Sequence, residues 1–170
     1  MRRNTMIFIT LLAVLILLAG CSGHHEVNLP KAVKFYYCNT DISYNESDGL
    51  ISAESRDYIG NTNNIEEILN EYLKGPSNDK FYSPFPNGTA LIEAEMGDDI
   101  LYITLNKAFS ELSGIDRTLA CACITRTLQE ITNVDSVVID VYGGIYGNNT
   151  SVTLDKSSFI TVDSSLYSGD

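Results

Sequence analysis

The sequence predicts an α+β fold, a two-layer sandwich in which a mixed or antiparallel sheet of about four to five strands carries two helices on one face. Three features of the 170 residues indicate this class. Segments rich in β-branched and aromatic residues recur along the chain, two other segments have apolar residues at helical spacing, and Gly, Pro and Asn residues separate them. The expected order is strand, strand, helix, strand, strand, helix, strand and a tail. An apolar share of 44% is enough for one packed core.

Two strands are expected before the first helix. Residues 32–38 have strand composition, and residues 50–56 form a weaker second strand after a polar turn region. Because side chains alternate between the two faces of a strand, Val33, Phe35 and Tyr37 share one face. We expect that face to lie on the core.

An amphipathic helix is expected over residues 65–73. Its apolar residues fall at i, i+3, i+4, i+7 and i+8 and are Ile65, Ile68, Leu69, Tyr72 and Leu73. Asn64 is placed to cap the N-terminus with Glu67 three residues on, and Gly75-Pro76 ends the helix.

Residues 91–96 and 100–105 are predicted to form a hairpin around Gly97-Asp98-Asp99. In the first strand, the residues expected to face the core are Ile92, Ala94 and Met96, and those expected to face water are Glu93 and Glu95. The second strand is apolar on both faces, which predicts a central place in the sheet. Asp98 and Asp99 are expected to be solvated at the hairpin tip, not to bind calcium or act as acid and base.

A second helix is expected over residues 117–131, with Asp116 as its cap and Asn133 beyond its end. Its inward stripe consists of Cys121, Ile124, Leu128 and Ile131, and Cys123 lies off it. Residues 136–142 are expected to form another central strand. Residues 150–154 and 159–162 are expected to form at most short edge strands.

The charge of the chain excludes one class of function. Residues 21–170 contain 9 basic and 22 acidic side chains, a net charge of −13. Nucleic-acid binding is excluded, because neutralising phosphates requires a basic surface. Acidic exported domains stay soluble by self-repulsion, so the charge alone specifies no cationic partner.

Residues 1–20 are interpreted as a lipoprotein signal peptide. Two arginines precede a 13-residue apolar run, which is short for a membrane span because a span needs about 20 residues. Leu18-Ala19-Gly20-Cys21 then resembles the bacterial lipobox, in which a diacylglycerol is attached to the cysteine sulfur and the signal is cut just before it. Cys21 is therefore the predicted lipidation site, and its acyl chains would hold the protein on the extracytoplasmic face of the cell membrane. The alternatives are an ordinary signal peptide or an uncleaved anchor.

The rest of the chain is divided into three parts. Residues 21–31 are expected to be the lipidated N-terminus and a polar stalk, residues 32–163 a single domain, and residues 164–170 a tail. The stalk contains His24 and His25. Adjacent histidines without further ligands nearby are interpreted as solvated linker, so neither a metal site nor a cofactor is predicted.

Three cysteines follow Cys21, namely Cys38, Cys121 and Cys123. Cys121 and Cys123 lie two residues apart on the predicted helix, so their side chains point about 200° apart and cannot bond to each other. The favoured interpretation is that all three are small apolar packing residues. A bridge from Cys38 to one of the other two is the alternative in an oxidising compartment.

Several short motifs, in this order and spacing, resemble the sporulation and spore-germination domain called GerMN. They are Leu73-Lys74-Gly75-Pro76, Pro86-Asn87-Gly88-Thr89, Tyr102-Ile103-Thr104-Leu105-Asn106 running to Phe109, Arg126-Thr127-Leu128-Gln129-Glu130, and the strand at 134–143. The resemblance covers about residues 32–154. The chain departs from the family pattern at Thr104, where an Asp is usual, and has room for one such domain where better-known members carry two.

The resemblance implies an envelope-assembly module of sporulation or germination, with a fold similar to the ring-building modules of secretion systems. It carries over no catalytic residue. The sequence itself shows no phosphate loop after a strand and no nucleophile with an evident base partner. The predicted function is therefore a membrane-tethered binding or assembly module, not an enzyme, with envelope or sporulation proteins as partners.

Two other functions compete with this one. A binder of small molecules or peptidoglycan would stack aromatic side chains on sugars or peptides, and the candidates are Tyr36, Tyr37, Tyr82, Phe85, Tyr142 and Tyr146. The opposing interpretation is that most of these tyrosines are half-buried strand residues. A hydrolase would use paired carboxylates among Glu93, Glu95, Asp98 and Asp99, on a face that is expected to be solvated.

Overall fold

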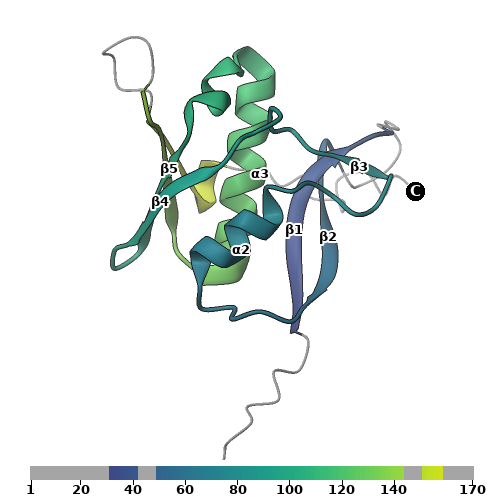
Figure 1. Ribbon diagram of the computed structural model, residues 1–170, viewed down its shortest axis with the longest axis horizontal. Coiled ribbons are helices and arrows are strands. Elements are labelled where there is room, and N and C mark those ends of the chain that lie inside the picture. Colours follow the sequence, from purple (N-terminus) through teal and green to yellow (C-terminus); the bar gives the residue numbers. More distant parts are fainter. Residues whose placement is uncertain (1–30, 42–48, 144–150, 159–170) are drawn as a thin grey trace, which may run out of the picture.

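The computed structural model describes residues 31–41, 49–143 and 151–158. Its elements, drawn in Figure 1, are β1 (Lys31–Asn39), β2 (Ile51–Tyr58), α2 (Ile65–Tyr72), β3 (Phe81–Tyr82), β4 (Leu91–Met96), β5 (Ile100–Leu105), the 3-10 helix η1 (Lys107–Glu111), α3 (Gly114–Thr132), β6 (Ser136–Val141), β7 (Val152–Asp155) and the 3-10 helix η2 (Lys156–Ser158). The predicted signal peptide, Cys21, the stalk, the strand at 159–162 and the tail lie outside the described residues.

The α+β class is confirmed, but the strands divide between two sheets. The first sheet has the order β2-β1-β3 and is antiparallel, and the second has the order β4-β5-β6-β7. In the second sheet β5 and β6 run parallel, and the two outer pairs are antiparallel. The expectation of one sheet of four to five strands with both helices on one face is corrected accordingly. The hairpin β4–β5, the central places of β5 and β6, and the edge position of β7 are confirmed.

Side chains of α2 and α3 occupy the edge of β1 that could otherwise pair with a strand of the second sheet. The short strand β3 pairs only with Cys38 and Asn39, which leaves part of one edge of β1 without a neighbouring strand. On that edge the backbone N–H of Tyr36 donates to Thr127 Oγ1 of α3 (2.9 Å), and the Tyr36 carbonyl accepts from the Tyr72 hydroxyl of α2 (2.7 Å). The backbone N–H and carbonyl of Tyr36 thus find hydrogen-bond partners in helix side chains and not in a neighbouring strand.

Helix α3 lies between the two sheets, as Figure 1 shows. It packs against β1 on one side and against β6 on the other. Cys121, Ile124 and Leu128 of the predicted stripe are buried, and Ile131 is partly buried. Cys123 and Thr127 lie off that stripe and are buried as well, because they contact Cys38 and Tyr36 of β1 in the first sheet. Thr125, on a different side of the helix from Cys123, is also buried.

The start of α3 differs from the prediction. The helix begins at Gly114 with Ser113 as the N-cap, so the expectation of Asp116 as the cap is wrong. Asp116 lies in the first turn instead, where a negative charge favours the helix dipole. At the other end Asn133 is the C-cap and has a left-handed φ of 60°, as its place beyond the helix suggested.

The predicted features of β1 and α2 are confirmed. Val33, Phe35 and Tyr37 are buried, and the Asn64 side chain accepts a hydrogen bond from the Glu67 backbone N–H at 3.2 Å. The Tyr72 ring of α2 packs against three others, with centroid distances of 5.5 Å to Phe35, 5.0 Å to Tyr37 and 5.2 Å to Phe85. This aromatic cluster joins α2 to the first sheet.

The orientation predicted for β4 is partly wrong. A β-bulge interrupts the pairing between Leu91 and Glu93, and the extra residue, Ile92, is 53% exposed. Met96 lies on the edge strand of the second sheet and is 47% exposed, although its partner Leu101 is fully buried. Ala94, which pairs with the buried Ile103, packs against the core as expected.

Thr127→Val is expected to destabilise the protein by about 1–3 kcal/mol, because the partly buried N–H of Tyr36 loses its acceptor while the side-chain volume is kept. Thr118→Val, at an exposed position of the same helix, is the matched control and should change stability by about 0.5 kcal/mol or less. Urea unfolding followed by circular dichroism measures both. Equal effects of the two variants would show that the Thr127 bond does not stabilise the edge of β1.

Candidate functional site

A buried ion pair fixes the loop after α2 to the first sheet. The Glu54 carboxylate is 6% exposed and accepts from Arg56 Nε (2.6 Å) and from the Ser77 N–H (3.0 Å) and hydroxyl (2.9 Å). Arg56 Nη2 donates to the Gly75 carbonyl (2.7 Å) and to the Tyr37 hydroxyl (3.1 Å). Gly75 has a φ of 96°, which L side chains rarely adopt, so the turn requires glycine.

A second polar anchor fixes the loop before β4. The Asn106 side chain donates to the Gly88 carbonyl (2.8 Å), and its backbone N–H donates to the Ala90 carbonyl (2.9 Å). The Thr89 hydroxyl closes the turn by donating to the Pro86 carbonyl at 2.8 Å. Together the two anchors hold the segment between α2 and β4 at both ends.

That segment forms one wall of a pocket of about 230 Å³, which we call the Tyr82 pocket. Its lining residues are Cys38, Tyr82, Ser83, Pro84, Phe85, Pro86, Leu112, Asp116 and Leu119. β1 supplies Cys38, and α3 with the residues before it supplies the opposite wall. The lining is mainly apolar, with the Asp116 carboxylate, the Tyr82 hydroxyl and the Cys38 thiol as its chief polar groups.

The Cys38 thiol is paired with a second thiol behind it. Cys38 Sγ lies 4.0 Å from Cys123 Sγ, and both residues are buried free thiols, as is Cys121. The hydrogen bond from Cys123 lowers the pKa of Cys38 to about 7, and the Tyr82 hydroxyl acts in the same direction, whereas burial and Asp116 oppose them. The same hydrogen bond and burial raise the pKa of Cys123 well above its usual value. For Cys121, burial is the main cause of a raised pKa.

Cys38 is expected to react with methyl methanethiosulfonate at a rate whose pH midpoint is about 7, compared with the ordinary thiol value of 9.0. The thiolate is the nucleophile, so a lowered pKa increases the reactive fraction at neutral pH. Labelling at pH 5.5 to 10 followed by peptide mass spectrometry measures the rate at each cysteine. Cys121 is the internal control and should react more slowly at pH 7. A Cys38 rate that still rises steeply above pH 8.5 would contradict this assignment.

The aromatic candidates differ in their exposure. Tyr37 and Phe85 are buried, and Tyr36 is half-buried with Arg126 stacked on its ring at 5.1 Å. Tyr82 (46% exposed) and Tyr142 (67% exposed) are available for contact, and of these two only Tyr82 lines the pocket. Tyr146 lies outside the described residues. The interpretation as half-buried strand residues is confirmed for Tyr36, whereas Tyr37 of the same strand is fully buried and Phe85 lies in the loop after β3.

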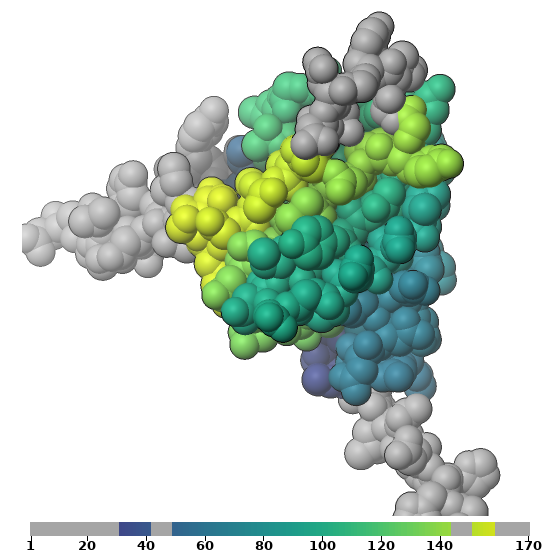
Figure 2. Space-filling view, turned by 90° about the vertical axis from the view of Figure 1, so that its left-hand side faces the viewer, coloured from purple at the N-terminus to yellow at the C-terminus, as the bar shows by residue number. Residues whose placement is uncertain are grey.

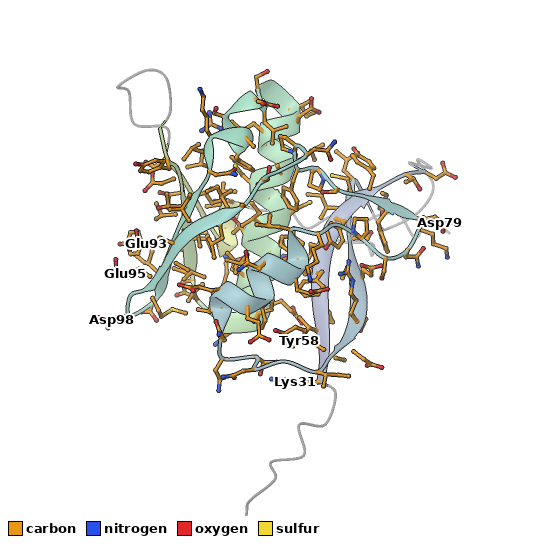
Figure 3. The ribbon with its side chains drawn as sticks, in the orientation of Figure 1. Lys31, Tyr58, Asp79, Glu93, Glu95 and Asp98 are labelled. Atoms are coloured by element: carbon orange, nitrogen blue, oxygen red, sulfur yellow. The ribbon has the colours of Figure 1, made fainter. Side chains whose placement is uncertain are left out.

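The carboxylate candidates lie on the outer face of the second sheet and at its hairpin tip. Glu93 and Glu95 are exposed and point away from α3, and Asp98 lies at the tip, as Figure 3 shows. Glu93 pairs with Thr104, which pairs with Asp140, so these three side chains lie across the same face. The space-filling view in Figure 2 shows this side of the molecule, where strands of the second sheet reach the surface. The predicted solvation of these carboxylates is confirmed.

The described residues contain neither a metal-binding cluster nor a membrane-spanning helix. No group of three or more His, Cys, Asp or Glu side chains in these ranges is arranged to hold a metal ion. In the same ranges, no helix is both long and apolar enough to cross a bilayer. His24 and His25 lie outside them.

The fold matches solved structures, and the sequence matches a family model. The first GerMN domain of the sporulation protein GerM from Bacillus subtilis has a TM-score of 0.57 and 16% identity, covering 75% of this chain and 98% of that one. The tandem GerMN domains of the same protein have a TM-score of 0.50 and 19% identity, covering 73% of this chain and 43% of that one. No curated protein sequence matches. The model of the family Germane, described as sporulation and spore germination, matches residues 34–145.

The chain belongs to the Germane, or GerMN, family. The resemblance predicted from the short motifs is thus confirmed, and the structure shows what several of these motif residues do. Gly75 and Gly88 accept the hydrogen bonds that anchor the two loops, and Thr127 closes the edge of β1. These GerMN motif residues therefore maintain the fold.

Sequence reasoning did not find the Tyr82 pocket. Its lining comes from β1, from the segment after β3 and from the start of α3, which are far apart in the chain. The closest sequence signal is the pair of prolines around Phe85, which indicates a rigid loop but gives no sign of its opposite wall.

Proposed function

We propose that this protein is an extracytoplasmic lipoprotein, tethered to the cell membrane by lipid on Cys21, whose GerMN domain is a non-catalytic binding or assembly module. Membership of the sporulation and germination family carries this proposal. The N-terminal sequence supports the anchor, because a cysteine follows a short apolar run in a lipobox-like motif. Its partners would be envelope or sporulation proteins.

The size and chemistry of the Tyr82 pocket support a protein partner over a free small molecule. Ligand pockets usually have volumes of about 300–1,000 Å³. A pocket of about 230 Å³ instead suits one apolar side chain of a partner, received between Phe85 and Leu119. Aromatic residues with a polar group at the edge, as at Tyr82, are frequent at protein interfaces.

Lipidation is tested by feeding cells an alkyne fatty acid and comparing the full chain with its Cys21→Ala variant. The label should appear on the wild-type protein in the membrane fraction and be absent from Cys21→Ala. The Cys38→Ala variant is the matched control and should retain the label. Labelling of Cys21→Ala, or an unlabelled wild type, would refute the lipid anchor.

Partner binding is tested by crosslinking in sporulating cells, followed by capture of the full chain and mass spectrometry. Tyr82→Ala should reduce the yield of a captured envelope protein about tenfold, the loss typical of an interface anchor worth more than 1 kcal/mol. Tyr142→Ala removes an equally large exposed ring outside the pocket and should leave the yield unchanged. Capture that is equal for all three proteins would exclude the pocket as the contact.

A second candidate function is peptidoglycan binding, which the exposed Tyr82 and Tyr142 rings favour because aromatic rings stack on sugars. Co-sedimentation of the full chain with purified peptidoglycan tests it. Sedimentation that is lost in Tyr82→Ala would support wall binding, and failure to sediment would remove it.

A further inference from the structure

The buried thiols of Cys38 and Cys123 lie on elements that no local sequence signal connects. Cys38 is in β1 and Cys123 is in α3, 85 residues apart in sequence, and their sulfur atoms are 4.0 Å apart. Their exposed fractions are 1% and 0%. The third thiol, Cys121, contacts Arg117 instead. The tertiary structure thus distinguishes between two possible partners of Cys38 that the sequence left open.

Both thiols are almost fully buried, and they differ in their position relative to the Tyr82 pocket. Cys38 lines the Tyr82 pocket, whereas Cys123 is not among the lining residues and lies behind it. Thiol–disulfide exchange needs one thiol that a disulfide can approach and a second one close enough to resolve the mixed disulfide. The Tyr82 pocket is the side from which a disulfide would approach Cys38, and Cys123 lies within 4.0 Å of it. The lowered pKa of Cys38 favours it as the attacking group.

We propose that Cys38 and Cys123 are a redox-active pair that a disulfide-bearing oxidant outside the membrane converts to an intramolecular disulfide. The Cys38 thiolate attacks one sulfur of the oxidant, a new S–S bond forms, and the S–S bond of the oxidant breaks to release a thiolate that takes up a proton. Cys123 then loses its proton and attacks the Cys38 sulfur, which releases the second thiolate of the oxidant. The two cysteines lose two electrons and two protons, and the oxidant becomes a dithiol.

The bond would have a structural consequence. It would join the first sheet to α3 and close a loop of 85 residues, which restricts the unfolded chain. The oxidised protein is therefore expected to melt roughly 10 °C higher than the reduced protein. The thiol of Cys38 would also be removed from the Tyr82 pocket, so oxidation would change the surface offered to a partner.

The test uses the full chain, purified in detergent and equilibrated with mixtures of reduced and oxidised glutathione. We expect a loss of two hydrogen atoms in intact mass, a Cys38–Cys123 linked peptide, and the higher melting temperature. Cys121→Ala is the matched control and should behave like the wild type, whereas Cys38→Ala and Cys123→Ala should form no bond. A bond that includes Cys121, a persistent glutathione adduct on Cys38, or thiols that stay reduced in excess oxidised glutathione would each overturn the proposal.

The state in the cell is a second readout, obtained by acid quenching and alkylation of the full chain from aerated cultures. The pair is expected to be protected from alkylation until a reductant is added, and free thiols would overturn the proposal. The measurement in cells rests on the extracytoplasmic location given in the proposed function, whereas the glutathione titration of the purified protein is independent of that location. Bond formation in the tube with free thiols in the cell would therefore contradict the oxidation proposed in the envelope while leaving the proposed binding function intact.

Discussion

Arg56→Met is expected to lower the free energy of unfolding by about 3–5 kcal/mol, because it leaves the buried Glu54 carboxylate without its cation. Methionine preserves much of the side-chain length but removes the donors to Glu54, Gly75 and Tyr37. The stacking of the guanidinium over Phe35, at 5.0 Å from the ring centroid, is lost as well. Equilibrium urea unfolding followed by circular dichroism measures the change.

Lys34→Met is the matched control for this prediction. It breaks the ion pair of Lys34 with Glu130, whose side chains are 53% and 40% exposed, so stability should change far less than in Arg56→Met. The double variant Glu54→Gln with Arg56→Met should recover part of the loss, because the uncompensated charge is then absent. A small effect of Arg56→Met alone would mean that the Gly75 loop does not depend on this ion pair.

Tyr72→Ala is expected to destabilise the protein by about 3–5 kcal/mol, because the Tyr72 ring is fully buried at the centre of the aromatic cluster. The ring contacts Phe35 and Tyr37 of the first sheet and Phe85 of the pocket wall, so its removal leaves a cavity where α2 meets both. Equilibrium unfolding in urea measures the loss.

Two further variants separate the contribution of ring packing from that of the Tyr72 hydroxyl and from the loss of any tyrosine ring. Tyr72→Phe keeps the ring and removes only the hydroxyl that donates to the Tyr36 carbonyl, which should cost about 1 kcal/mol. Tyr142→Ala removes an exposed tyrosine ring and should change stability by about 0.5 kcal/mol or less. Similar losses for Tyr72→Phe and Tyr72→Ala would show that the hydrogen bond, not the ring packing, fixes α2.

Most strands and helices were located correctly from the sequence, and the wrong predictions concern which side chains are buried and what covers them. The alternation of Val33, Phe35 and Tyr37 identified the buried face of β1, and Asn64 identified the start of α2. The alternation in β4 misplaced Ile92, because a β-bulge inserts this residue between Leu91 and Glu93 without a partner in β5. A bulge depends on the pairing of two strands, and no pattern within one strand reports it.

The sequence of α3 contains a pattern from which its position between two sheets could have been predicted. Its buried residues include Ala120, Cys123, Thr125 and Thr127, so they are not confined to one stripe. A helix buried on more than one side has no single apolar face, and a weak stripe is what such a helix presents in sequence. Small residues on several sides of α3 therefore indicated a helix between two layers.

The sequence by itself determined the class of the fold, most strand and helix segments, the acidic charge and the GerMN resemblance, and it predicts lipidation at Cys21. The fold class and the segments follow from local periodicity, capping and composition, which act within a few residues, whereas the GerMN resemblance and the lipidation site rest on short motifs. The tertiary structure decided that the strands form two sheets, that the Tyr82 pocket exists, and that Cys123 rather than Cys121 faces Cys38. The physical reason is that periodicity states which face of an element is apolar, whereas the partner that covers it is selected only when all elements pack together.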